Sequence, residues 1–151
     1  MSFSPRALAV GELAWRLLAT HGLAGWSFAY NRSKRHMGQC LYGPRLIVLS
    51  THFVELNGDE AVLDTLLHEI AHALVGPGHG HDAVWQAKCV EVGAKPERLS
   101  HDVNMPVGPW QAVCPGCGRL HDRHRRPKHL VGWSCCYCGR ERGRLTWGRA
   151  G

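Results

Sequence analysis

The chain has 151 residues, 44% of them hydrophobic, and a formal net charge of +6 with a pI near 9.2. This length and composition fit one soluble domain, or one small domain with an appendage held by a metal. The apolar run 7–23 is broken by Glu12, Arg16 and His21, which argues against a bilayer-spanning helix and a signal peptide. We therefore expect a cytoplasmic or nucleoid-associated protein without membrane partners. Its seven cysteines are then expected to be metal ligands or free thiols rather than disulfides.

The first part of the chain is predicted to form a helix and then three short strands. Pro5 stands in the first turn of the helix, which ends near Gly22. Alternating polarity indicates a strand over 26–30, and a second strand is expected within 36–42. The continuous apolar run 46–50 indicates a third strand. We predict that the three strands form a small antiparallel meander.

The next predicted helix carries the motif His-Glu-x-x-His, formed by His68, Glu69 and His72. Carboxylates and apolar residues alternate ahead of the motif, and the helix ends at Gly76. Because histidines four residues apart lie on one face of a helix, the two rings can bind one Zn²⁺, and Glu69 can reach a metal-bound water. The alternative is a core helix that carries histidines and no metal.

A catalytic zinc ion needs a third protein ligand from outside this helix, because such sites combine three protein ligands with one open position. His79 and His81 follow directly after the helix break, and Glu91 lies on the next predicted helix, 83–92. We favour His81, because it precedes Trp85 by one turn at the start of that helix, where its ring would be fixed against the core. His79 lies between two glycines and is less constrained, and a glutamate one helix later serves in some zinc peptidases.

Ordinary zinc chemistry then assigns the roles. The metal lowers the pKa of its bound water, and Glu69 takes the proton and passes it to the leaving amine. Tyr42, His79 and His101 are candidate donors to the oxyanion, although single polar residues of this kind are more often surface or packing residues. We expect a substrate peptide to add as a strand to an exposed sheet edge, for which 45–50 is the candidate.

Two Cys-x-x-Cys-Gly pairs near the C-terminus predict a closed, structural zinc site. Seventeen residues, 118–134, separate the two pairs, a spacing typical of four-cysteine sites. Cys136 falls outside this spacing and is expected to be a free thiol. Two thiol pairs without metal are the alternative. The predicted ligands are Cys114, Cys117, Cys135 and Cys138.

Positive charge is concentrated in the same part of the chain. From Ala112 onward, nine basic residues are opposed only by Asp122 and Glu141. A basic loop with a nearby aromatic residue, Trp133, suits contacts with phosphates and stacking on bases, and DNA is the favoured partner. A solvated surface that only improves solubility is the alternative. The predicted nucleic-acid contacts are Arg119, Arg123, Arg125, Arg126 and Lys128.

The stretch 67–74, followed by Gly-His-Asp-x-x-Trp, resembles the SprT-like (Spartan-type) zinc metalloproteases and is similar to the related WLM proteases. The upstream runs 26–28 and 45–50 resemble the strands that precede the active helix of that family. The resemblance implies an α+β fold, in which a zincin-like core of helix, small antiparallel sheet and active-site helix precedes a small zinc ribbon. It also implies cleavage of proteins bound or crosslinked to nucleic acid, and it favours His81 as the third ligand.

We therefore predict a metalloprotease domain over 1–109 and a four-cysteine zinc ribbon over 110–151, with one catalytic and one structural zinc ion. The predicted activity is that of a zinc-dependent endopeptidase in DNA–protein crosslink repair. The alternative is a nucleic-acid-binding or regulatory zinc-ribbon protein with a protease-like fold and no relevant turnover. Glu69 favours the enzyme, because binding alone requires no general base.

Overall fold

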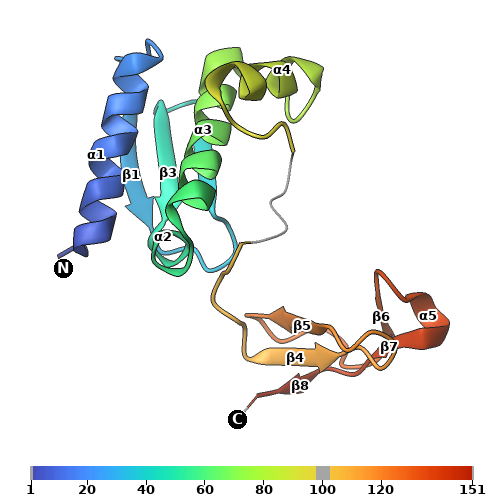
Figure 1. The fold of residues 1–151 in the computed structure, drawn as a ribbon. Coiled ribbons are helices and arrows are strands. Elements are labelled where there is room, and N and C mark those ends of the chain that lie inside the picture. The colour runs from blue at the N-terminus through green and yellow to red at the C-terminus, as the bar shows by residue number, and fades with distance from the viewer. Residues whose placement is uncertain (1, 98–102, 151) are drawn as a thin grey trace. The chain divides into compact units, whose positions relative to one another are not determined.

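The computed structural model describes residues 2–97 and 103–150, which belong to two compact units, Met1–Met105 and Pro106–Gly151 (Figure 1). The first unit combines helices with a small sheet, and the second consists mainly of short strands. The predicted α+β class, with a C-terminal cysteine cluster compatible with a zinc ribbon, is confirmed. None of the helices in the described ranges has both the length and the apolar character that a bilayer crossing requires.

Three of the four helices of the first unit begin at a residue whose side chain caps the helix. The side chain of Ser4 caps the first helix and that of Asp82 caps the fourth, which ends at Gly93 with φ 93°. The second helix was not predicted, and the side chain of Ser50 caps it directly after a strand. The four helices are α1 (Pro5–Thr20), α2 (Thr51–Leu56), α3 (Asp59–Val75) and α4 (Ala83–Val92).

Strands β1 (Ser27–Asn31), β2 (Gly38–Leu41) and β3 (Leu46–Ser50) form a mixed sheet in the order β1-β3-β2. β1 runs parallel to β3 and β2 runs antiparallel to it, so the predicted antiparallel meander is wrong. The reason lies in β3, whose apolar residues are buried on both faces and which therefore takes the centre of the sheet. β2 is consequently an edge strand, and β3, the predicted edge for substrate, is not.

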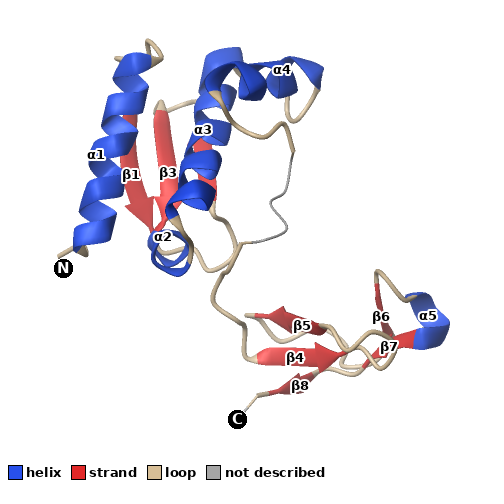
Figure 2. Ribbon diagram, viewed as in Figure 1, coloured by secondary structure: helices blue, strands red, loops and turns tan. Residues whose placement is uncertain are grey.

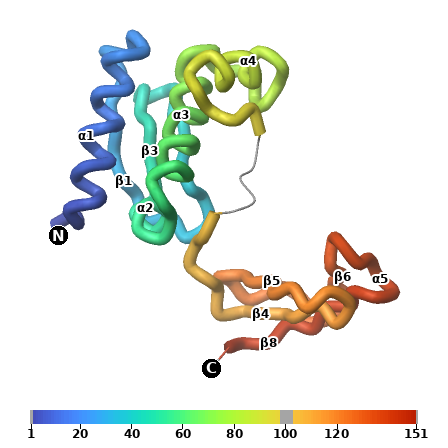
Figure 3. Tube along the Cα trace, in the orientation of Figure 1, coloured from blue at the N-terminus to red at the C-terminus, as the bar shows by residue number. Residues whose placement is uncertain are grey.

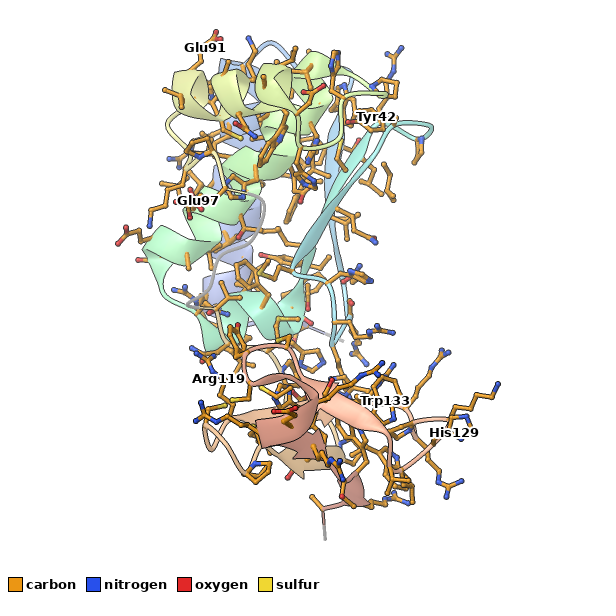
Figure 4. The ribbon with its side chains drawn as sticks, turned by 90° about the vertical axis from the view of Figure 1, so that its right-hand side faces the viewer. Tyr42, Glu91, Glu97, Arg119, His129 and Trp133 are labelled. Carbon is orange, nitrogen blue, oxygen red and sulfur yellow. The ribbon has the colours of Figure 1, made fainter. Side chains whose placement is uncertain are left out.

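A single hydrophobic core joins the sheet to the helices, which cover one face of it (Figures 2 and 4). Val62, Leu66 and Ile70, four residues apart, give α3 a fully buried stripe, and Phe53 and Trp85 join them from α2 and α4. Burial of each such side chain is worth about 1.5–3 kcal/mol. The helix with the His-Glu-x-x-His motif is thus anchored along its length, and Figure 3 traces the chain from α1 through the sheet to α3 and α4.

The second unit has only a small core, in which Ala112, Leu145 and Trp147 pack against two cysteines. Small units of this kind usually need disulfides, a metal or a partner to stay folded. Part of the segment predicted as a basic loop is a strand, because it pairs with its neighbour as a hairpin. The elements are β4 (Trp110–Val113), β5 (Leu120–Arg123) and β8 (Gly148–Arg149) in one sheet, β6 (Trp133–Cys135) and β7 (Gly143–Leu145) in another, and the short helix α5 (Gly139–Arg142).

Candidate functional site

The motif side chains of α3 line a cleft of about 510 Å³. Edge strand β2 forms one wall, and the turn after α3 together with Trp85 of α4 forms another. Tyr42, directly after β2, donates a hydrogen bond from its hydroxyl to the backbone carbonyl of His72 at 3.1 Å, and Figure 4 labels it. The predicted motif residues His68, Glu69 and His72 therefore open into one cleft.

The buried indole of Trp85 brings the three predicted histidine ligands together. The ring of His72 stacks on it at a centroid distance of 5.0 Å, and the rings of His81 and His68 meet it edge-on at 4.7 and 5.4 Å. The rings of His72 and His81 are themselves 5.0 Å apart. The indole N–H donates to the backbone carbonyl of His68 at 3.2 Å. Trp85 thus holds the start of α4, and His81 just ahead of it, against the motif.

The two alternative third ligands lie elsewhere. His79 pairs with the carboxylate of Asp82 at 3.0 Å. Glu91, labelled in Figure 4, pairs with Lys88 at 2.8 Å on α4, and the side chain of Glu91 is 68% exposed. The geometry therefore favours His81 over both. His101, a candidate donor to the oxyanion, lies outside the described residues.

The pKa values of two residues in the cleft suit metal binding and proton transfer. Burial raises the pKa of the Glu69 carboxyl to about 7. Burial, reinforced by His81 and His68, lowers the pKa of His72 to about 4. At neutral pH His72 is therefore uncharged and keeps a lone pair for a metal, and Glu69 is poised to exchange a proton.

Gly38 of β2 allows the strand to pass close to the motif. A Cβ at this position would lie 2.8 Å from the side chain of Leu49 and 3.4 Å from Cγ of Glu69. Two residues further along β2, burial and then the charge of Glu69 raise the pKa of the Cys40 thiol to about 12, so it stays neutral. The sequence analysis missed both roles, because they depend on the pairing of β2 with β3.

The four predicted ribbon cysteines form a metal-ligand cluster whose sulfur atoms all lie within 4.8 Å of one another. In the described part of the chain, no other group of three or more His, Cys, Asp or Glu residues meets this distance. Gly118 and Gly139, which follow the two pairs, adopt φ values of 74° and 75°, as the tight turns require. Cys136 is exposed and outside the cluster. The cluster of Cys114, Cys117, Cys135 and Cys138 can bind zinc.

Backbone hydrogen bonds favour the thiolate form of one cysteine of this cluster, Cys114. Burial opposes ionisation of Cys114, but the backbone N–H groups of Cys117 and Gly116 lower the pKa of its thiol to about 7. Since the ligand is the thiolate, this shift favours metal binding at neutral pH.

Three of the five predicted nucleic-acid contacts lie over aromatic rings of the same unit. Arg119 lies 3.9 Å from the ring centroid of Tyr137, and Arg123 lies 5.0 Å from that of Trp133. Arg126 lies 5.6 Å from that of Trp110. Figure 4 labels Arg119 and Trp133. All five predicted contacts, Arg119, Arg123, Arg125, Arg126 and Lys128, are exposed.

Comparison with known proteins places this geometry in a family. The SprT-like family matches residues 13–105, which is more than half of the chain and includes the motif, His81 and Trp85. No curated protein and no solved structure matches the chain. The matched region ends where the first compact unit ends, so that unit is a metalloprotease-like domain. The predicted resemblance is confirmed, and the chain belongs to the SprT-like family.

Proposed function

We propose that the protein is a zinc-dependent endopeptidase that cleaves proteins bound or crosslinked to nucleic acid. The observation that carries this proposal is the convergence of His68, His72 and His81 on the indole of Trp85, beside a carboxyl group with a pKa of about 7. Three imidazoles are a ligand set that suits catalytic zinc. When bound there, zinc supplies the Lewis acidity that activates water and polarises the scissile carbonyl.

Within this proposal, Glu69 accepts the proton of the attacking water and delivers it to the leaving amine. Tyr42 is the proposed donor to the developing oxyanion. Burial, followed by the influence of Cys40 and Glu69, raises the pKa of Tyr42 to about 12, so its hydroxyl keeps its proton at neutral pH.

The substrate is proposed to bind as an extended segment along β2. This strand lines the cleft and pairs with β3 on one side, and no strand of the described residues pairs with its other side. Main-chain hydrogen bonds to such an edge bind a peptide largely independently of its sequence. Because Gly38 sets β2 close to Glu69, a peptide on this edge lies beside the proposed base.

The nucleic-acid part of the proposal is supported by the exposed basic residues of the second unit. Arginines such as Arg119 and Arg123 can contact phosphates, and the aromatic residues beneath them, Tyr137 and Trp133, offer stacking surfaces for bases. Phosphate contacts and stacking of this kind depend little on the base sequence of the nucleic acid. The protein would accordingly select its substrates because they are bound to nucleic acid, and not because of their own sequence.

The test compares wild-type protein with Glu69→Gln on a DNA-binding protein substrate, with and without DNA. The variant should keep its zinc and fold but lose cleavage, because an amide cannot accept the proton. Glu60→Gln, an exposed change on the same helix, is the matched control and should cleave normally. Equal cleavage by wild type and Glu69→Gln would exclude Glu69 as the base. DNA binding without any cleavage would support the nucleic-acid-binding alternative.

A further inference from the structure

Two buried side-chain nitrogen atoms of the second unit, Nε2 of His121 and Nε1 of Trp147, have no hydrogen-bond partner. Among the residues that the structure describes, no other buried side-chain nitrogen or oxygen atom lacks one. A buried polar atom without a partner costs free energy, so each such atom in a folded protein requires an explanation. Both atoms lie in the unit that carries the cysteine cluster, which suggests where the missing partner is.

His121 faces the small core of this unit from β5. It pairs across the sheet with Ala112 of β4, which is 3% exposed, whereas its neighbours Leu120 and Asp122 are exposed. Because paired residues of adjacent strands share one face of a sheet, the ring lies on the same face as the buried Ala112. The described side chains of that core are apolar apart from three cysteines, so sulfur is the side-chain acceptor that this core offers.

The sulfur beside His121 is that of Cys135, which ends β6 and is 1% exposed. Burial opposes ionisation of this thiol, but the backbone N–H groups of Tyr137 and Cys138, and then the side chain of His121, hold its pKa below the ordinary value. A neutral thiol accepts hydrogen bonds weakly, whereas a metal-bound thiolate accepts charge-assisted ones. The metal-bound form of the cluster therefore supplies the acceptor that the buried ring lacks.

We infer that His121 is a positioning residue of the thiolate metal site, whose ring N–H donates a hydrogen bond to the Cys135 thiolate when a metal is bound. Four thiolates outweigh the charge of one Zn²⁺, and an N–H donor at a sulfur stabilises the excess negative charge. The bond also joins β5 of one sheet to β6 of the other. This inference is independent of the proposed peptidase activity, since it concerns the second unit alone.

Two variants of His121 separate the N–H donor from the shape of the side chain. His121→Phe keeps a planar ring but removes both nitrogen atoms, and His121→Gln removes the ring but keeps an N–H donor. His129→Gln is the matched control, because it removes an exposed imidazole from the same unit (Figure 4). His129 accepts the indole N–H of Trp133 only through its backbone carbonyl, so this control leaves that hydrogen bond intact.

Titration of the full chain with Co²⁺ measures the affinity of the thiolate site, because thiolate-to-cobalt charge-transfer absorbance arises only where cysteine sulfur binds the metal. Loss of a group that hydrogen-bonds to a metal ligand typically costs about 10–100-fold in metal affinity, and His121→Phe should show a loss of this size. His121→Gln and His129→Gln should remain close to wild type. The charge-transfer absorbance per bound cobalt should be the same in all four proteins, because the four thiolates stay the ligands.

Three results would overturn the inference. The first is wild-type cobalt affinity in His121→Phe, and the second is an equal loss in His121→Phe and His121→Gln, because the N–H donor would then not matter. The third is a changed charge-transfer absorbance per cobalt in His121→Phe, because His121 would then be a ligand.

If His121→Phe does not fold, NMR of the wild-type protein loaded with ¹¹³Cd²⁺ decides. A ring N–H proton of His121 that is coupled to ¹¹³Cd through the sulfur is the expected result, and the absence of that coupling would overturn the inference.

Discussion

Replacing Glu69 with glutamine should change how the stability of the zinc-free protein depends on pH. Burial raises the pKa of the Glu69 carboxyl from 4.5 to about 7. Between these values the folded protein retains a proton that the unfolded chain has released. The stabilising contribution is therefore fully present below about pH 4.5 and is lost as the pH rises through about 7. At about 1.4 kcal/mol per pKa unit, roughly 2–3 kcal/mol should be lost between about pH 5 and pH 8.

Urea unfolding of wild type and Glu69→Gln after chelation of zinc, followed by tryptophan fluorescence, measures this effect. Wild type should lose about 2–3 kcal/mol relative to the variant over this pH range. His72, whose lowered pKa acts in the opposite direction at acid pH, is present in both proteins and cancels in the comparison. A difference between the two proteins that does not change with pH would refute the reasoning, because it would mean that the carboxyl ionises as easily in the folded state as in the unfolded one.

Three further predictions concern the cleft wall, the ribbon and its charges. Gly38→Ala should reduce the rate of peptide cleavage at unchanged zinc content, because its Cβ would push β2 away from Leu49 and Glu69; kinetics with elemental analysis check this. Cys117→Ser should lower the zinc content from two ions per chain to one, because three thiolates leave the structural site open. Joint replacement of Arg123, Arg125, Arg126 and Lys128 by alanine should flatten the salt dependence of oligonucleotide binding by about 0.7–0.9 in log–log slope per lost phosphate contact, measured by fluorescence anisotropy. An unchanged slope would place the nucleic-acid surface elsewhere.

The features that the sequence predicted correctly are those with local causes. The helix over Ala83–Val92 and the strand over Leu46–Ser50 have the predicted bounds, because a cap, a glycine or an apolar run marks their ends. The four ribbon cysteines come together because two residues between thiols let both reach one metal. Each of these signals lies within a few neighbouring residues of the element that it defines.

The features that the sequence analysis missed depend on contacts between distant segments. The order of the strands is one, because a continuous apolar run indicates burial but does not say which strands flank it. The contact between His68 and Lys95 is another, because it joins residues 27 positions apart through a backbone atom. The residue type at position 95 could not have predicted this contact, since every residue type supplies the same backbone carbonyl.

The two candidate metal sites differ in what holds them together. The histidine site is built on a hydrophobic core in which Trp85 is 1% exposed and packs against all three rings, so its residues are positioned by packing. The thiol cluster lies in a unit with few buried side chains, so there the free energy of metal binding is in large part folding free energy. Where the fold does not depend on the metal, the metal can keep one coordination position open, as catalysis requires. Where the metal holds a small unit together, the protein has to fill every coordination position. The difference in core size between the two units therefore argues for the same division into a catalytic and a structural site as the ligand types do.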